Sequence, residues 1–284
     1  MPARLVAVDL DGTIVRRDRT VSARTRRALR RCEAAGIRIV VVTARRWLAA
    51  APLLADLGLG GIAIVAGGGA VRDVASGRVL VSSALAPSTV AVVVARIEDC
   101  GLQPMVAVDH GERHFVGDPR ADGPAAATYL ARGAVVRGRL DHSTRLPTTR
   151  VLAMGPASRI RSAAARCLGL DCHLLVQDGI FRFDAGGQRP LEFHASAATK
   201  GTALRDLCHQ LGVALADVLA VGDARSDLAM FEVAGQAVLM GQAEPGLRRP
   251  GVVVAPTVDD DGAAWAIETL ALPVRVRSRR HASL

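Results

Sequence analysis

The stretch VDLDGTIV, Val8–Val15, decides how the fold is interpreted. It overlaps the end of an apolar run, RLVAV (Arg4–Val8), which is typical of a buried β-strand. Asp9 and Asp11 lie two residues apart where this strand ends, so the alternation of side chains along a strand directs both carboxylates to one side. Gly12 then permits a tight turn. Carboxylates at the carboxyl end of a parallel strand lie where open α/β sheets bind ligands, so Asp9 and Asp11 are candidates for a ligand site. The alternative interpretation of the same residues is an acidic turn exposed to solvent.

Further apolar runs alternate with helical patterns in the first and last parts of the chain. Continuous apolar strands separated by helices predict a parallel sheet that is covered on both faces. The expected strands are Ile37–Val42, Gly61–Ala66, Val218–Asp223, Gln236–Met240 and Gly251–Ala255, with a hairpin over Ala70–Ser83 around Ser76-Gly77. The expected helices are Ser22–Ala35, Arg45–Leu57, Lys200–Leu211, Ser226–Ala234 and Gly262–Leu270.

The middle of the chain has a different pattern, with mixed helices and strands and a Gly/Pro-rich region near Gly111–Gly123 that we expect to be irregular. Its expected elements are the helices Ser88–Cys100 and Ser158–Leu168 and the strands Arg150–Met154, His173–Gln177 and Ile180–Asp184. We therefore predict an α/β fold. A doubly wound, Rossmann-like core spans residues 1–83 and 189–272, an α/β domain is inserted at 84–188, and a basic tail occupies 273–284.

The composition excludes several classes of protein. Of the 284 residues, 50% are hydrophobic and 22% are charged, which is too apolar for a disordered chain. No apolar run approaches the roughly 18 residues that span a bilayer, and the N-terminus reaches acidic residues too soon for a signal peptide. The five cysteines form no CxxC motif. We expect a cytoplasmic protein with reduced thiols.

The charge is strongly positive, with 36 Lys+Arg against 27 Asp+Glu and a formal net charge of +9. Compositional drift towards arginine is one explanation, and attraction of anionic ligands is the other. Only 3% of the residues are aromatic, which disfavours stacking on nucleic-acid bases. Lys200 is the only lysine in the sequence. A compact ammonium group is a point-charge partner for phosphate, whereas survival by chance is the competing account of Lys200.

Three more segments carry polar side chains next to predicted elements. VVVTAR places Thr43 after the second apolar strand, and ATKGTAL places Lys200 at the start of a helix. VGDARSD places Asp223 and Asp227 after a late strand. Together with DLDGT (Asp9–Thr13), these motifs resemble, in order, those of the haloacid dehalogenase-like hydrolase superfamily, and specifically its Cof-like branch of sugar-phosphate phosphatases. The inserted domain matches the position and size of that branch's α/β cap.

The resemblance implies a mechanism. Asp9 would attack phosphorus to form an aspartyl-phosphate that water then hydrolyses. Asp11 would protonate the leaving alcohol and later deprotonate the water. Mg²⁺, held by Asp9, the Asp11 main-chain carbonyl and Asp223, would offset repulsion between carboxylate and phosphate. Thr43, Ala44 and Lys200 would hold the phosphoryl oxygens.

Some residues depart from the branch's usual pattern. Ser226 and Gly68 stand where the branch usually has Asn, Ala44 replaces a Gly, and Gln242 replaces an Asn. None of these changes removes a catalytic group. The resemblance further implies that Asp227, with Ser226 beside it, orients Lys200 or a water bound to the metal.

We expect a Mg²⁺-dependent phosphatase that acts on a small phosphorylated metabolite, and a sugar phosphate is the first candidate for its substrate. Two alternatives remain: a nucleotide or phosphoglycerate-type ester as substrate, and a non-catalytic protein that binds phosphate ligands on the same scaffold. The cluster DHGERH (Asp109–His114) is either a metal- or substrate-binding group or, as we favour, an exposed polar turn between strands. The oligomeric state is left open.

Overall fold

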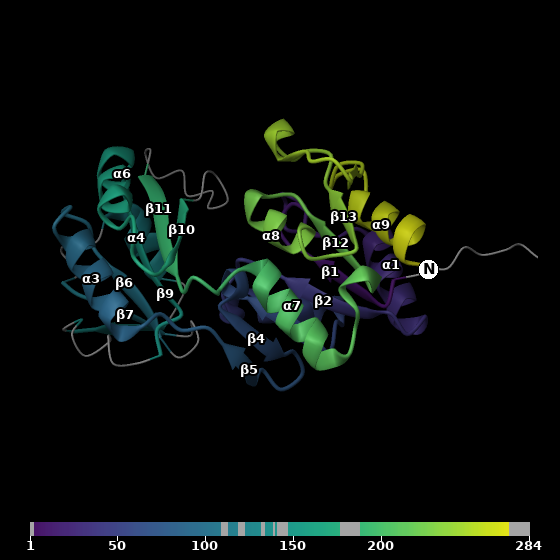
Figure 1. The fold of residues 1–284 in the computed structure, drawn as a ribbon, viewed down its shortest axis with the longest axis horizontal. Coiled ribbons are helices and arrows are strands. Elements are labelled where there is room, and N and C mark those ends of the chain that lie inside the picture. Colours follow the sequence, from purple (N-terminus) through teal and green to yellow (C-terminus); the bar gives the residue numbers. More distant parts are fainter. Residues whose placement is uncertain are drawn as a thin grey trace, which may run out of the picture. The chain divides into compact units, whose positions relative to one another are not determined.

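The computed structural model describes residues 3–108, 113–118, 123–131, 134–138, 140, 147–176 and 188–272. The chain divides into two compact units, Met1–Val41 with Arg205–Leu284, and Val42–Leu204. In the described residues, hydrogen bonds join eight strands into one sheet, in the order β14-β13-β12-β1-β2-β3-β4-β5. Six more form a second sheet, in the order β10-β11-β9-β6-β7-β8. The fold is therefore α/β, as predicted (Figure 1).

The first unit is built around a buried parallel sheet. Its central strand, β1, has four apolar residues that are all buried, and it pairs in parallel with β2 and β12. Strands β12, β13 and β14 continue the sheet in parallel. Parallel pairing of such apolar strands needs both faces to be covered. The strands are β1 (Leu5–Val8), β2 (Arg38–Val42), β12 (Val218–Gly222), β13 (Gln236–Leu239) and β14 (Val252–Val254).

Helices from distant parts of the chain pack on this unit. The first, α1 (Ala23–Ala34), starts where Ser22 Oγ accepts the Thr25 backbone N–H at 3.0 Å, and it ends before Gly36. It packs against α9 (Gly262–Ala266) and the following π-helical turn Ile267–Ala271. The short helix α8 (Leu228–Phe231) packs against β12 and β13. The predicted helix at 226–234 is thus a 3₁₀ turn, Arg225–Asp227, followed by one α-helical turn.

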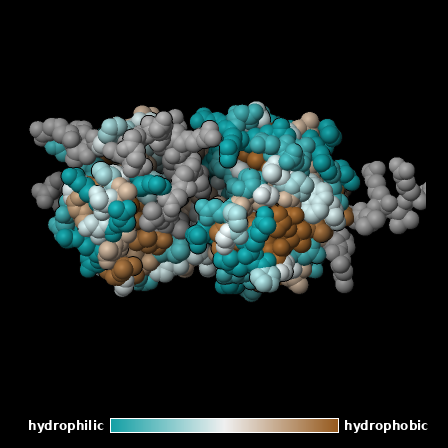
Figure 2. Space-filling view, turned by 90° about the horizontal axis from the view of Figure 1, so that it is seen from above, coloured by the Kyte–Doolittle hydropathy of each residue, from teal (hydrophilic) through white to brown (hydrophobic). Residues whose placement is uncertain are grey.

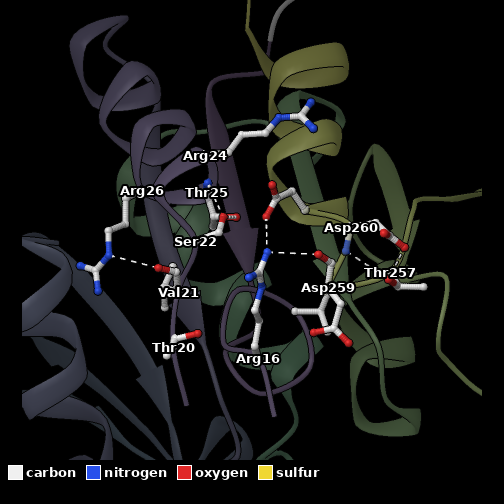
Figure 3. A network of polar contacts seen from close by, with 12 residues as sticks. Arg16, Thr20, Val21, Ser22, Arg24, Thr25, Arg26, Thr257, Asp259 and Asp260 are labelled. Carbon is white, nitrogen blue, oxygen red and sulfur yellow. Dashed lines mark hydrogen bonds and ion pairs between the residues drawn. The ribbon is translucent and has the colours of Figure 1, made fainter. Parts of the chain in front are cut away.

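The loop that follows β1 is held by the C-terminal part of the first unit. Arg16 Nη2 donates to the Asp259 backbone carbonyl at 3.1 Å and to Asp261 Oδ1 at 2.9 Å (Figure 3). Arg24 Nη2 forms an ion pair with Glu268 Oε2 at 2.7 Å. Residues more than 240 positions apart therefore fix the chain that leaves the acidic motif.

The second unit continues the large sheet with antiparallel strands. Strands β3 and β4 pair in antiparallel register, and β4 pairs with β5 through the expected hairpin. Gly77 has a φ of +69° there, as a tight turn requires. Helix α2 lies between β2 and β3 in the sequence and ends at Gly58 in a left-handed conformation. The elements are α2 (Trp47–Leu57), β3 (Ile62–Val65), β4 (Ala70–Asp73) and β5 (Val79–Ser82).

The six-stranded sheet also belongs to the second unit, and each of its faces packs on different helices. Helices α3 (Pro87–Glu98) and α6 (Ala157–Arg166) pack on one face, against residues such as Val151 and Phe193. The short helix α4 (Pro124–Leu130) packs on the other face, against Leu152 and its neighbours. The strands are β6 (Met105–Val108), β7 (Arg113–Val116), β8 (Ala134–Arg137), β9 (Arg150–Pro156), β10 (His173–Val176) and β11 (Gln188–His194).

The middle of the chain differs from the sequence prediction in several places. The region near Gly111–Gly123 was expected to be irregular, yet it contains strand β7. His114, from the cluster expected to be an exposed turn, is fully buried on that strand. The expected strand Ile180–Asp184, the tail 273–284, and Asp109, His110 and Glu112 lie outside the described residues. The six-stranded sheet extends to His194, beyond the expected boundary at residue 188, and the division into domains stays a prediction.

The exposed large apolar side chains are spread over several elements. The face seen in Figure 2 mixes hydrophilic and hydrophobic residues, which is ordinary for a protein surface. None of the helices among the described residues is long and apolar enough to cross a membrane. The exposed residues of this kind are Leu48, Leu80, Val92, Leu168, Val253 and Val254.

Candidate active site

Three carboxylates meet where β1 and β12 end, in the first unit. Because Val8 lies opposite Val221 in the parallel pair, Asp9 and Asp223 leave the sheet at the same edge. The Asp9 backbone N–H also donates to the Val221 carbonyl at 3.0 Å. One carboxylate oxygen each from Asp9, Asp223 and Asp227 lies within 4.8 Å of the others. Two strands that are distant in sequence thus create one acidic cluster.

Asp227 is fully buried and holds the turn that carries Asp223. Its Oδ2 accepts the backbone N–H of Asp223 at 3.0 Å and that of Ala224 at 2.9 Å. Gly222 lies so close that a Cβ there would be 2.4 Å from Asp227 Cγ. Asp227 therefore fixes the backbone on which Asp223 is presented. Ser226 is half-buried on the same 3₁₀ turn.

Asp223 is surrounded by the acidic loop and by a glutamine. Gly12 has a φ of +78°, and a Cβ on it would lie 2.1 Å from Asp223 Oδ2, so only glycine leaves room for this carboxylate. Thr13 Oγ1 lies 3.5 Å from Asp223 Oδ1. Gln242 Nε2 donates to the Gly12 carbonyl and lies 3.5 Å from Asp223 Oδ2, while its Oε1 accepts the Val258 N–H at 3.0 Å.

Asp9 and Asp11 differ in their exposure. Asp9 is buried, the intervening Leu10 is fully buried, and Asp11 is half-buried. The backbone N–H groups of Ile14 and Val15 both donate to the Leu10 carbonyl, which closes the turn. The acidic pair therefore sits on a tightly bonded loop.

The donor set of the cluster is suited to a hard divalent cation. All three side chains offer carboxylate oxygens, the ligand type that Mg²⁺ takes in proteins. Gly12 keeps the space beside Asp223 open. The cluster includes Asp227 in addition to the predicted Asp9 and Asp223. However, the Asp227 oxygen that bonds two backbone N–H groups is already engaged in holding the turn.

In the second unit, Thr43 follows β2 and begins a loop that is closed by backbone hydrogen bonds. Its N–H donates to the Ile64 carbonyl at 2.9 Å, and its carbonyl accepts the Gly67 N–H at 3.0 Å. Its Oγ1 accepts the Arg45 N–H at 3.1 Å, which leaves the hydroxyl proton to be donated. Thr43 is buried, and within the described residues nothing accepts the Ala44 N–H.

Lys200, also in the second unit, is 2% exposed at the first residue of α7 (Lys200–Leu211). The helix start is stabilised by Thr199, whose Oγ1 accepts the Thr202 N–H at 3.0 Å. Gly68 has a φ of +108°, and a Cβ on it would lie 2.3 Å from the Thr199 carbonyl oxygen. The glycine at this position therefore lets the backbone before Lys200 approach closely.

The sequence analysis assigned no function to two residues that the structure identifies as candidates, Gln242 and Arg46. Gln242 was identified only as a departure, but it bonds the acidic loop and a metal-ligand candidate. Arg46 is 7% exposed and lies 3.4 Å from His114 Nδ1. The sequence feature that could have identified Gln242 as functional is its position in a family motif. No local pattern distinguishes Arg46 from the many other arginines.

Comparisons with known proteins agree with this arrangement. A model of the haloacid dehalogenase-like hydrolase family matches residues 6–267. The 5-amino-6-(5-phospho-D-ribitylamino)uracil phosphatase YwtE of Bacillus subtilis is 27% identical, over 94% of this chain and 98% of that protein. The HMP-PP phosphatase of Cronobacter sakazakii is 28% identical over 86% of each chain. The crystal structure of a haloacid dehalogenase-like hydrolase from Bacteroides thetaiotaomicron superposes with a TM-score of 0.76 and 25% identity, covering 94% of this chain and 98% of that one.

Proposed function

Because this chain belongs to the haloacid dehalogenase-like hydrolase family, we propose that it hydrolyses a small phosphate monoester, a sugar phosphate or related metabolite, in a Mg²⁺-dependent reaction through an aspartyl-phosphate. The chain is an enzyme, a phosphatase of this family. The observation that carries the proposal is the meeting of Asp9, Asp223 and Asp227 at the ends of β1 and β12. The relatives named above act on phosphorylated metabolites, and this supports the substrate class.

In the proposed reaction, two aspartates divide the chemistry. A carboxylate oxygen of Asp9 attacks phosphorus, forming a P–O bond to the aspartate while the bond to the leaving oxygen breaks. Asp11 gives a proton to that leaving oxygen and later takes one from the water that attacks the aspartyl-phosphate. Burial of Asp9 restricts its orientation, and partial exposure of Asp11 gives it access to water, which suits these roles.

Thr43, Ala44 and Lys200 are the residues that we propose for the phosphoryl oxygens. Thr43 has a hydroxyl proton to donate, and the adjacent Ala44 N–H offers a second donor. Lys200 adds a positive charge where negative charge develops in the transition state. The carboxyl end of β2, which precedes Thr43, lies at the same edge of the sheet as that of β1, because Val8 pairs in parallel with Val41. This register supports the assignment.

Asp9, Asp223 and the Asp11 main-chain carbonyl would hold Mg²⁺. When bound, this ion would neutralise charge between the Asp9 carboxylate and the phosphate. Asp227 and Gln242 would orient Asp223, with Ser226 beside them on the turn. Positioning by such neighbours commonly sets metal affinity.

The test is phosphate release from a panel of small phosphate monoesters, measured with Mg²⁺ and with excess chelator. We expect turnover with Mg²⁺, its loss after chelation and its recovery when Mg²⁺ is restored. The panel includes sugar phosphates, a nucleoside monophosphate and a phosphoglycerate. Binding of these esters without any turnover would instead support a non-catalytic phosphate-binding protein.

A further inference from the structure

The β3–β4 loop, Ala66–Gly69, connects two antiparallel strands and is bonded to the segment that contains Thr43. The Ala66 N–H donates to the Arg45 carbonyl at 2.8 Å, and the Gly67 N–H donates to the Thr43 carbonyl at 3.0 Å. Both bonds join backbone groups. They therefore fix the path of the loop relative to the chain that follows β2.

Three successive residues of this loop have positive φ angles. The values are +52° for Ala66, +67° for Gly67 and +108° for Gly68. The left-handed region is unfavourable for an L-residue with a side chain, and Ala66 adopts it although it is buried. Backbone strain of this kind persists only where the surrounding structure fixes it, and it is concentrated at functional sites. The strained backbone therefore marks the loop as a candidate for a role in the reaction.

Gly68 makes the contact of the loop with the start of α7. A Cβ at this position would lie 2.3 Å from the Thr199 carbonyl oxygen and 2.9 Å from the Thr199 nitrogen, which is too close for any side chain. The obstructing atoms belong to the backbone, so they cannot move aside as the end of a flexible side chain could. Gly68 is buried, and its φ also disfavours other residues. Both the contact and the conformation therefore require glycine.

Thr199 connects this contact to Lys200. Its carbonyl accepts the Ala203 N–H at 3.0 Å, and its Oγ1 accepts the Thr202 N–H at 3.0 Å, so the first turn of α7 is bonded to it. A displacement of Thr199 would move the start of the helix and, with it, the adjacent buried Lys200. The competing explanation is that the loop only packs the hairpin against α7 and contributes to stability.

We infer that Gly68 is a positioning residue for Lys200, and that the β3–β4 loop holds this lysine in register with Thr43. The inference rests on the proposed function, in which both side chains bind the same phosphoryl group. The evidence is that one loop is bonded to the Thr43 backbone and lies against the Thr199 backbone, within a single unit. Gly68 touches no reacting atom, so its effect on the reaction passes through Lys200.

Gly68→Ala tests the inference, and Gly61→Ala is the matched control. Gly61 precedes β3, has a φ of +83° and leaves open space around a Cβ, so alanine there brings strain without a contact. The assay is hydrolysis of p-nitrophenyl phosphate with Mg²⁺, and thermal melts show which variants are folded. We expect Gly68→Ala to lower kcat/KM at least roughly tenfold, because small errors in a positioned group are costly. Gly61→Ala should keep kcat/KM within about threefold of the wild type.

A double-mutant cycle with Lys200→Ala shows whether the effect passes through the lysine. In the Lys200→Ala background, Gly68→Ala should cost less than about threefold, because the group that the loop positions is absent. An equal loss in both backgrounds would show that Gly68 acts elsewhere. A wild-type rate from Lys200→Ala would show that the lysine has no function for the loop to support. Either result overturns the inference.

The requirement for Mg²⁺ decides the question if Lys200→Ala is too slow to measure. The concentration of Mg²⁺ that gives half of the maximal rate depends on the acidic cluster, which belongs to the other unit. We expect Gly68→Ala to leave this concentration within about twofold of the wild-type value while kcat falls. A concentration that rises in proportion to the loss of rate would show a general distortion of the protein and would overturn the inference.

Gly69→Ala covers the case in which Gly68→Ala does not fold or has no measurable rate. Gly69 has an ordinary φ of −69°, and a Cβ there would lie 3.2 Å from the Ala66 carbonyl oxygen, so alanine crowds the same loop mildly. We expect a folded variant whose kcat/KM falls at least roughly threefold with an unchanged Mg²⁺ requirement. Full activity in Gly69→Ala overturns the inference. If the wild type releases no phosphate from any ester of the panel, the proposed function itself is refuted.

Discussion

Asp223 is presented by its neighbours rather than by its own strand alone. Asp227 holds the backbone of the turn, Gln242 approaches the carboxylate, and Gly12 leaves the space that it fills. Gly12 is distant from Asp223 in sequence, whereas Asp227 lies on the same turn as Asp223 and Gln242 follows the next strand. The geometry of the acidic cluster therefore depends on these three residues.

Gly12→Ala is expected to damage the site more than the fold. The new Cβ would meet Asp223 Oδ2 at 2.1 Å, and an error of about 1 Å in a positioned group can cost roughly 10²-fold in rate. Gly36→Ala is the matched control, because Gly36 has a similar φ of +73° with no atom within 4 Å of a Cβ. Both variants suffer left-handed backbone strain of roughly 1–2 kcal/mol. Initial rates and thermal melts are compared, and equal activity in the two variants would contradict the role of Gly12.

Lys200→Arg tests the only lysine in the chain. A guanidinium is larger and directional, so in this buried position it would displace the phosphate that we propose Lys200 binds. We expect most activity to be lost with little change in melting temperature. Arg205→Lys, the reverse exchange at an exposed position of α7, should leave the rate unchanged. Wild-type rates from Lys200→Arg would remove Lys200 from the site.

At the scale of elements, the sequence predicts the apolar strands of the large sheet well, but in the six-stranded sheet it misses the apolar β6 as well as the more polar β7 and β11. Strands β1 and β12 are continuous apolar runs, and α7 begins and ends at the predicted residues, Lys200 and Leu211. The predicted candidates Asp9 and Asp223 then meet because both strands are parallel neighbours. The position of Asp227 against the Asp223 backbone could not be predicted, since it depends on a 3₁₀ turn.

Strands β7 and β11 were not predicted, for a physical reason. Each carries charged or polar residues that a window of sequence treats as exposed, yet His114 and Glu192 are buried. Their burial is tolerated because Arg46 and Arg150, from other elements, supply the hydrogen bonds. Such compensation is a property of the tertiary structure and leaves no local pattern.

The burial of His114 on β7 makes the stability of the protein depend on pH. Its pKa in the folded protein is about 3, lowered by burial and by Arg150 and Arg46 against an opposing contribution from Glu192, whereas an unfolded histidine titrates near 6.5. Between these values only the unfolded state binds the proton, so the free energy of unfolding falls as the pH drops below about 6.5. The loss attributable to His114 between pH 7 and pH 5.5 is about 1 kcal/mol.

Urea unfolding of His114→Asn at both pH values measures this contribution. The variant keeps an acceptor near the Nδ1 position for Arg46 but cannot titrate. We expect it to lose less stability than the wild type between pH 7 and 5.5, by about 1 kcal/mol, whereas His209→Asn behaves as the wild type. An unchanged pH dependence in His114→Asn would show that His114 is protonated in the folded state.

At the scale of the whole molecule, the described strands form two sheets. The parallel part of the large sheet gathers the acidic groups at its carboxyl edge, as open α/β sheets do. The six-stranded sheet holds buried polar residues, His114, Arg150, Glu192 and His194, that hydrogen bonds link to one another and to Tyr129.

The central claim is that Asp9 is the nucleophile of a phosphatase, and the rate of phosphate release by Asp9→Asn tests it most directly. An amide has the shape of the carboxylate but cannot act as the anionic nucleophile. With a saturating chromogenic phosphate ester and Mg²⁺, we predict a loss of at least roughly 10³-fold, with a melting temperature near that of the wild type. Asp206→Asn, the same exchange at an exposed position of α7, should keep the full rate. A folded Asp9→Asn variant with activity within tenfold of the wild type would contradict the claim.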